Sequence, residues 1–182
     1  VRSSKKGKGK MALLQPLTLL DMVVYKKENT DIQRISEWRC VDSYHSIPLE
    51  IKKTAICMFL SEVLYKSIRE VESSEELFSF LQHSMKILDA METGYENFHL
   101  QFLVKLSRLL GFGLDSSPNF MMSFQAKEEP LVRHLLDKSY TEHIGIGGSL
   151  RKVILDHIID FYKQHVDALK EVKSLAVLRE VF

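Results

Sequence analysis

The hydrophobic pattern of the sequence changes from strand-like to helical near residue 44, and this change restricts the folds open to the chain. Segments 17–25 (LTLLDMVVY) and 32–40 (IQRISEWRC) are rich in leucine, β-branched and aromatic residues and flank the polar segment KKENTD. Such a pattern predicts two strands joined as a hairpin. Because an isolated hairpin is only marginally stable, we expect these strands to belong to a larger sheet or to pack on helices.

Helical spacing of apolar residues begins after residue 44. Ser46 is expected to cap a first helix, whose broad apolar face runs through segment 51–64. A second, amphipathic helix is expected to open at Ser73, three residues before Glu76 in a capping box, and to end near Gly94. Short loops between such helices are typical of a bundle.

Three later segments extend the helical region. Residues 97–113 are expected to form a helix that closes on the glycines of GFG, since glycine tolerates the left-handed conformation that ends helices. The alternating sequence FMMSF at 120–124 indicates one short strand within a loop. Ser149 is expected to cap a last long helix, and residues 173–182 to add one or two helical turns. The chain is therefore expected to be α+β, mostly α, with residues 1–43 forming one domain and residues 44–182 a helical domain.

The first ten residues carry five cations and no acidic residue. These cations are Arg2, Lys5, Lys6, Lys8 and Lys10. The whole chain has 25 cations and 24 acidic residues, so the sequence after this basic head is mildly acidic. Such asymmetry predicts a polyanionic partner for the head. Five phosphate contacts on a single strand would give a salt slope of about 3.5. A solubilising tail or an artificial N-terminal segment remains an alternative.

Aromatic side chains near the predicted hairpin are candidates for stacking on bases. They are Trp38, Tyr25 and Tyr44, of which Trp38 is the one we assign to DNA binding, and partly buried packing is the alternative for each. The head itself contains no aromatic residue.

Two cysteines, Cys40 and Cys57, occur without a CxxC or CxxH pattern. This pattern excludes a disulfide scaffold and a cysteine zinc site, and it is typical of a reducing cytoplasm. No apolar run is long enough to span a membrane. Because the first residue is Val, the sequence is expected to start partway into a longer gene product.

Few motifs point to catalysis. His157, Asp160 and His165 have helical spacing that metal ligands could use, but no HExxH motif is present and a solvated helix face explains them more simply. GIGGSLRK at 145–152 lacks the lysine and hydroxyl pattern of a P-loop and indicates a flexible turn into a helix. Neither cysteine carries a nucleophile signature. We therefore expect a protein that is not an enzyme, without catalytic residues, metal or cofactor.

Four segments together resemble one known family. They are the basic head followed by LLQPLTLLDMVVY, then KTAICMFLSEVLYKSI, FHLQFLVKLSRLLGFG and KSLAVLREVF. In this order they resemble the basic segment, the first long helix, a helix ending in glycines and the closing helix of the bacterial recombination mediator family RecO. The matches are spread over nearly the whole chain.

The resemblance implies a fold and a function. In RecO proteins a small OB-fold barrel precedes a helical domain, so residues 1–43 would be the C-terminal part of an OB-fold with the basic head as a loop between strands. By the same resemblance the protein would bind single-stranded DNA, anneal complementary strands and assist RecA loading with RecR. The five cations of the head would contact phosphates, and the OB-fold groove would follow the DNA backbone.

Two details qualify the resemblance. Several family members carry a cysteine zinc motif before the last long helix, whereas residues 113–149 contain no cysteine here, so zinc is not expected. Relatives also bind the acidic, hydrophobic tail of single-strand-binding protein in a basic pocket of the helical domain. The candidate residues for that pocket are Phe102, Lys105, Leu106 and Arg108, with exposed cations on a core helix as the alternative.

Two other functions remain open from the sequence. One is a helical protein-interaction adaptor whose basic tail never touches nucleic acid. The other is a metal hydrolase built on His157, Asp160 and His165.

Overall fold

The computed structural model describes residues 15–28, 30, 32–68, 74–114, 117–140, 142 and 144–182. They divide into two compact units, one ending at His45 and one spanning Ser46–Phe182, close to the predicted boundary between residues 43 and 44. The described residues are mostly helical with one two-stranded sheet, as expected for an α+β chain. No helix among these residues has the length and apolar character needed to cross a membrane.

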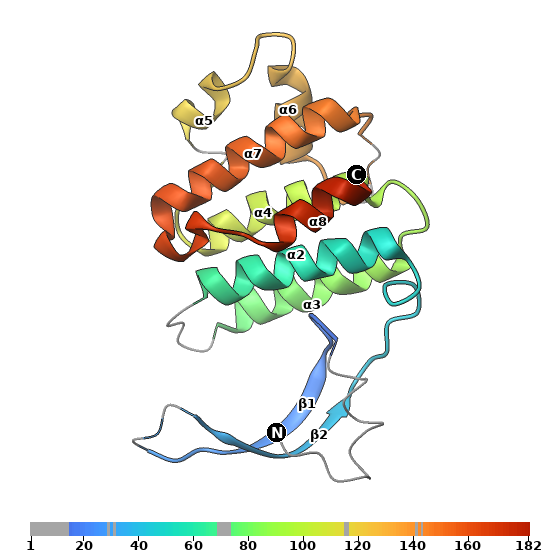
Figure 1. Cartoon of the computed structure of the whole chain (residues 1–182), viewed down its shortest axis with the longest axis vertical. Coiled ribbons are helices and arrows are strands. Elements are labelled where there is room, and N and C mark those ends of the chain that lie inside the picture. Colours follow the sequence, from blue (N-terminus) through green and yellow to red (C-terminus); the bar gives the residue numbers. More distant parts are fainter. Residues whose placement is uncertain are drawn as a thin grey trace. The chain divides into compact units, whose positions relative to one another are not determined.

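The first unit contains the predicted hairpin. Strand β1 (Leu20–Tyr25) pairs with strand β2 (Arg34–Cys40) in antiparallel register (Figure 1). The side-chain amide of Gln33 closes the connecting turn, since it donates to the carbonyls of Lys27 and Thr30. Nearly every residue of both strands is exposed or half-buried in the described structure.

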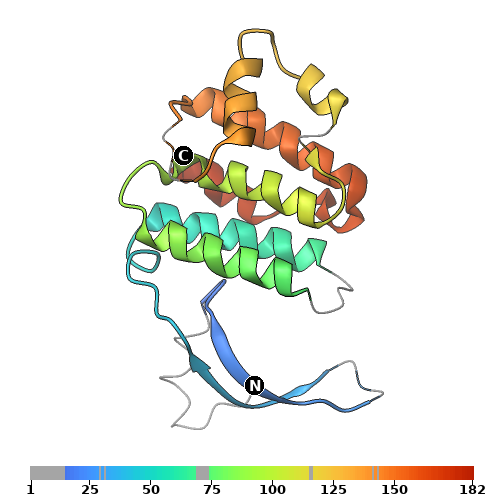
Figure 2. The same cartoon turned by 180° about the vertical axis from the view of Figure 1, so that it is seen from behind.

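The second unit is built from helices. They are α2 (Ile51–Ser67), α3 (Glu75–Ala90), α4 (Phe98–Leu109), α5 (Pro118–Met122), α6 (Glu129–Asp137), α7 (Gly148–His165) and α8 (Ser174–Val181), with short 3-10 turns at Tyr95–Asn97 and Asp167–Lys170. Helices α2 and α3 run side by side, α4 packs on α3, α7 crosses α4, and α8 returns to lie along α2 (Figures 1 and 2).

Helix α4 lies at the centre of this unit. Its apolar side chains Leu100, Phe102, Leu103 and Leu106 are completely buried. Such burial on every side requires its polar residues to find partners inside the protein. Gln101 accordingly donates to the carbonyls of Lys138 and Ser139, and the Ser107 hydroxyl donates to the carbonyl of Val104.

The predicted cap at Ser46 is wrong. Helix α2 begins at Ile51 with Glu50 as its N-cap residue, and the hydroxyl of Ser46 is used elsewhere. It donates to the carbonyl of Asp89 at 2.5 Å and accepts a hydrogen bond from the Lys53 ammonium at 2.6 Å. A contact with the end of α3 therefore takes the side chain that would otherwise cap α2.

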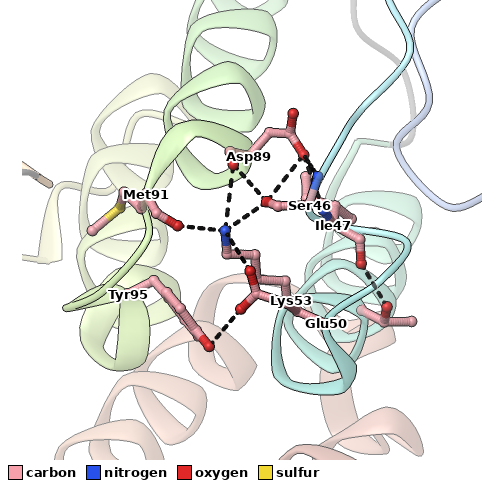
Figure 3. A network of polar contacts seen from close by, with 8 residues as sticks. Ser46, Ile47, Glu50, Lys53, Asp89, Met91 and Tyr95 are labelled. Carbon is pink, nitrogen blue, oxygen red and sulfur yellow. Dashed lines mark hydrogen bonds and ion pairs between the residues drawn. The ribbon is translucent and has the colours of Figure 1, made fainter.

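Lys53 is the centre of a buried polar network (Figure 3). Its side chain is completely buried, and its ammonium also donates to the carbonyls of Asp89 and Met91 and pairs with Glu50 at 3.3 Å. A buried charge is tolerated only when it is paired and hydrogen-bonded in this way. The network thus ties the turn before α2 to the end of α3.

Two carboxylates complete this network (Figure 3). Asp89 accepts the backbone N–H groups of Ser46 and Ile47 at 2.8 and 2.9 Å. Tyr95 donates its hydroxyl to Glu50 at 2.8 Å, and this bond holds the pKa of Glu50 below its ordinary value. Burial and the nearby Glu50 carboxylate raise the pKa of Tyr95 to about 12.

The predicted caps of two other helices also differ from the structure. The cap of α3 is Ser74, whose hydroxyl accepts the Leu77 N–H, while Ser73 lies outside the described residues. Helix α7 begins at Gly148 after the N-cap residue Gly147, so Ser149 lies inside its first turn. Glycine is among the residues favoured at N-cap positions, so Gly147 can begin α7 in place of Ser149.

The predicted strand at 120–124 is wrong, because helix α5 ends at Met122 and residues 123–124 form the turn after it. Pro118 starts α5, where its missing N–H breaks no helical bond. Phe120 and Phe124 are both buried and their rings contact each other edge to face at 5.1 Å, whereas Met122 is 81% exposed. The apolar side chains at 120 and 124 therefore follow helical spacing rather than alternation.

Glu62 joins the first and last helices of the unit. Its carboxylate accepts the backbone N–H groups of Lys173 and Ser174 and the Ser174 hydroxyl at the start of α8, and it pairs with Lys66 at 2.8 Å. Burial alone raises the pKa of Glu62, but the hydrogen bonds from Lys66 and Ser174 outweigh it and hold that pKa at about 2. A side chain of α2 thus acts as the cap of α8.

Candidate functional site

The predicted DNA-binding residues fall in two groups. Arg2, Lys5, Lys6, Lys8 and Lys10 all lie outside the described residues. Trp38 lies in β2, is half-buried, and stands opposite Met22 of β1. The hairpin is therefore the part of the predicted DNA surface whose geometry is visible.

A β-bulge gives the hairpin two different faces. Val23 pairs with Glu37 and Val24 pairs with Ile35, so Ser36 is the extra residue of β2. Such a bulge restores the alternation that the sequence itself breaks. One face then carries Leu20, Met22, Val24, Ile35, Trp38 and Cys40, and the other carries Asp21, Val23, Tyr25, Arg34, Glu37 and Arg39.

The polar face of the hairpin carries aromatic and cationic groups together. Tyr25 stands opposite Arg34 and is 59% exposed. Arg39 donates to Asp21 at 2.8 Å, but its side chain is 81% exposed, so this ion pair contributes little to stability. Trp38 lies on the other face, and the hydroxyl of Tyr44 donates to the Leu17 carbonyl at 2.8 Å. The polar face, which carries Tyr25, Arg34 and Arg39, therefore combines an aromatic ring with exposed guanidinium groups, whereas the face of Trp38 does not.

The predicted partner-binding residues divide between core and surface. Phe102 and Leu106 are completely buried, so they offer no surface to a partner. Lys105 is half-buried, with its ammonium 3.7 Å from the ring centroid of Tyr140. Burial, and then the neighbouring charge of Arg108, lower the pKa of Lys105. Arg108 is exposed at the end of α4.

Arg108 borders a hollow that the sequence analysis did not identify. The hollow has a volume of about 630 Å³ and is lined by Arg108, Gly111, Phe112, Gly113, Ser117, Asn119, Phe161, Gln164 and His165. Its walls come from the end of α4, the glycine turn after it, the start of α5 and the last turn of α7. Gly111 has a φ of 86°, which allows the chain to turn sharply and bring Phe112 to α7.

Three rings form one wall of this hollow. The imidazole of His165 stacks on Phe112 with the ring centroids 4.7 Å apart and the planes 14° apart. Phe161 lies 4.5 Å from the same imidazole. The Nδ1 atom of His165 lies 2.9 Å from the Phe161 carbonyl, which fixes the orientation of the ring. Phe161 and His165 share a face because they are four residues apart on α7.

The three residues considered for a metal hydrolase each have a different partner in the structure. His157 packs on Phe124 with the centroids 4.8 Å apart, Asp160 pairs with Lys163 at 2.8 Å, and His165 belongs to the stacked rings. Within the described residues no group of three His, Cys, Asp or Glu side chains is placed to hold a metal ion.

The cysteines have no activated environment in the described structure. Cys57 is 2% exposed in α2, and burial, with the Asp89 charge as a second cause, raises its pKa to about 12. A thiol with so high a pKa is a poor nucleophile. Cys40 donates to the carbonyl of Asp42.

Comparison with known proteins supplies the remaining evidence. The family model described as "Recombination protein O C terminal" matches residues 48–120. A protein of Bacteroides fragilis named "DNA repair protein RecO" is 35% identical, over 100% of this chain and 84% of that protein. Proteins of the same name from Flavobacterium psychrophilum and Christiangramia forsetii are 32% and 31% identical, over 99% and 100% of this chain and 83% and 84% of their own lengths. No solved structure matches.

Proposed function

Because the chain belongs to the RecO family of DNA repair proteins, we propose that it is a recombination mediator that binds single-stranded DNA. The proposed activity includes annealing of complementary strands and assistance to RecA loading together with RecR. The observation that carries the proposal is that identity of about one third extends over the full length of the chain rather than over one motif.

Charge supports the assignment of DNA to the first unit. Arg2, Lys5, Lys6, Lys8 and Lys10 would neutralise phosphates, and glycines and serines between them would let the head follow a variable backbone. The exposed guanidinium groups of the polar hairpin face would extend this contact. This binding requires no catalytic group, and we propose a protein that is not an enzyme and needs no metal or cofactor.

The apolar hairpin face supports a larger sheet. Met22 and Ile35 are 42% and 50% exposed on the same face as Trp38. Apolar faces of hairpins are stable when further strands or another layer cover them. We therefore propose that β1 and β2 belong to an OB-fold, and that residues 1–43 and 44–182 are an OB-fold part and a helical domain.

Lys105 and Arg108 support the proposed contact with the acidic tail of single-strand-binding protein. Both reach the surface from α4 while Phe102 and Leu106 hold that helix in the core. The proposal predicts that the double variant K105A/R108A weakens binding of an acidic, hydrophobic tail peptide. Unchanged peptide affinity in that variant would remove this partner assignment.

The test of DNA binding is fluorescence anisotropy of a labelled single-stranded oligonucleotide at several salt concentrations. We expect a salt slope of about 3.5, which falls by about 0.7 for each head cation replaced by Gln. A variant with four head cations changed to Gln is matched by a control with Lys86, Lys127, Lys152 and Lys170 changed to Gln, which removes the same charge from the helical unit and should keep the slope. Absence of binding at low salt would favour the alternative function, a protein-interaction adaptor.

Trp38 gives a second readout, because it is the only tryptophan of the chain. If its indole stacks on bases, a single strand quenches the intrinsic fluorescence on binding. Unchanged fluorescence at saturation, with anisotropy still reporting binding, would assign Trp38 to packing on the apolar face and leave the DNA-binding proposal intact.

A further inference from the structure

We propose that the hollow between α4, α5 and α7 binds one nucleotide unit of a single strand, with its base stacked on the ring of His165 and its phosphate near Arg108. The inference rests on the proposed function and adds a nucleic-acid contact on the helical unit. It is carried by the shape of the hollow, the arrangement of its rings and the kind of polar groups at its rim.

The size of the hollow suits a nucleotide. Sites for small organic ligands typically measure about 300–1,000 Å³, and this one measures about 630 Å³. A smaller hollow of about 140 Å³ adjoins it, since Ser117, Asn119, Phe161 and Gln164 line both. The two hollows therefore adjoin each other between α5 and α7.

The rings form a platform that ends in an exposed imidazole. Phe112 and Phe161 are half-buried beneath His165, and His165 is exposed. Base stacking needs a flat ring that is held in position and open on one side. Stacking on Phe112 and the contact of Nδ1 with the Phe161 carbonyl hold the imidazole in position.

Two amide side chains complete the site. Asn119 and Gln164 are both exposed and line the hollow, and neither side chain makes a hydrogen bond in the described structure. An amide group can donate and accept at once, which suits the edge of a base. Arg108 lines the same hollow from the end of α4, and a guanidinium suits a phosphate oxygen.

The charge of the hollow favours a nucleotide over an acidic peptide. Among the described residues, Arg108 is the one lysine or arginine that lines the larger hollow, and Asp160 lines the smaller one. A peptide with several carboxylates would gain one cationic contact and would meet one carboxylate. A nucleotide needs one cation for its phosphate and a neutral aromatic surface for its base, which is the combination present.

The test measures single-strand affinity against salt for variants of the full chain. His165→Ala should weaken binding about fivefold or more, because stacking is worth about 1–3 kcal/mol per base, which is about fivefold to 150-fold. Stacking releases no counterions, so the line of log affinity against log salt should shift without changing slope. Arg108→Gln should instead lower the slope by about 0.7.

Two matched variants keep the test clear. His134→Ala removes an exposed histidine of α6 that does not line the hollow, and this variant should bind as the wild type does. Gln164→Ala removes an exposed amide that makes no side-chain hydrogen bond to another described residue, so it should weaken binding without lowering the unfolding temperature. Wild-type affinity for both His165→Ala and Gln164→Ala would overturn the inference.

Photocrosslinking distinguishes the possible ligands. A single strand carrying 5-iodouracil should crosslink to Phe112, Phe161 or His165, located by mass spectrometry, and deoxythymidine monophosphate competing at micromolar concentration would show that a free nucleotide suffices. Crosslinks confined to the head and hairpin would overturn this inference while supporting the proposed function. Absence of any strand binding would overturn both. If His165→Ala and Gln164→Ala lose affinity for an acidic tail peptide but keep the strand, the site is a peptide site and the inference fails.

Discussion

The ammonium of Lys53 donates a hydrogen bond to the hydroxyl of Ser46, which lies seven residues earlier in the chain and 2.6 Å away. Ser46 in turn donates to the Asp89 carbonyl at the end of α3. One buried charge therefore joins the turn before α2 to a segment that follows it by more than thirty residues. The sequence around Lys53 reads as an ordinary amphipathic helix and gives no sign of this role.

Lys53→Met should destabilise the protein by about 3 kcal/mol, because it leaves several buried acceptors without a donor. Urea unfolding followed by circular dichroism measures the change. Lys52→Met is the control, since Lys52 is the exposed neighbour in the same turn and its change should stay within about 0.5 kcal/mol. Equal stabilities of the two variants would contradict the role assigned to Lys53.

Glu62→Gln should lower the free energy of unfolding at pH 7 by about 2 kcal/mol. The pKa of Glu62 is about 2 in the folded protein, below the ordinary value of 4.5. Its contribution is therefore complete above pH 4.5 and is lost as the pH falls from there towards 2. The stability difference between wild type and variant should shrink over the same range, and a difference that stays constant below pH 4.5 would contradict the assignment.

His99→Phe should flatten the pH dependence of stability. His99 is 1% exposed, its Nδ1 has no partner in the described structure, and burial, with the charge of Arg151 as a second cause, lowers its pKa to about 3. In the unfolded chain the imidazole of His99 is protonated as the pH falls below about 6.5, whereas in the folded protein it stays neutral down to about pH 3. Wild-type stability should therefore fall by up to about 1.4 kcal/mol for each pH unit below 6.5.

Denaturant unfolding between pH 7.5 and pH 5 measures this effect. The Phe variant keeps the ring contacts with Phe59 and Phe182 and should lose less stability than the wild type on acidification. His134→Phe, on the exposed surface of α6, should leave the wild-type profile unchanged. Parallel profiles for wild type and His99→Phe would contradict the prediction.

Gly111→Ala should cost about 1 kcal/mol, because a φ of 86° is strained for any residue with a β-carbon. Gly145→Ala is a matched control, since an added β-carbon meets no atom within 4 Å at either position. Its backbone is not in the left-handed region, so it should be neutral or slightly stabilising. Thermal unfolding of the two variants side by side measures the difference, and equal midpoints would show that Gly111 is not held at positive φ.

Local signals predicted the hairpin and the main helices well. The two strands follow from β-branched and aromatic composition, and α4 ends before Gly111 because glycine accepts the conformation that follows a helix. The faces of the hairpin could not be predicted, because the bulge at Ser36 depends on which residues of β1 stand opposite it. The register between two strands depends on both of them, so it cannot be predicted from the sequence of either strand alone.

Long-range contacts caused the main errors. Ser46 has the residue type of a helix cap, but Asp89 and Lys53 take its hydroxyl. FMMSF alternates like a strand, but Phe120 and Phe124 are both buried against α7, and the segment forms the end of α5 and the turn that follows it. The hollow beside α7 was missed for the same reason, since the glycine turn alone brings Phe112 to His165, more than fifty residues later in the chain.

The carboxylate of Glu62 on α2 caps α8, more than one hundred residues further along the chain. During synthesis the chain leaves the ribosome in order, so α2 emerges long before the helix that lies along it. The apolar surface that α8 covers stays open until residues 174–181 have been made, and open apolar surface on a nascent chain invites association with chaperones or with other chains. Completion of this unit is therefore tied to translation of its last helix, and a pause just before residue 174 would prolong the exposed state.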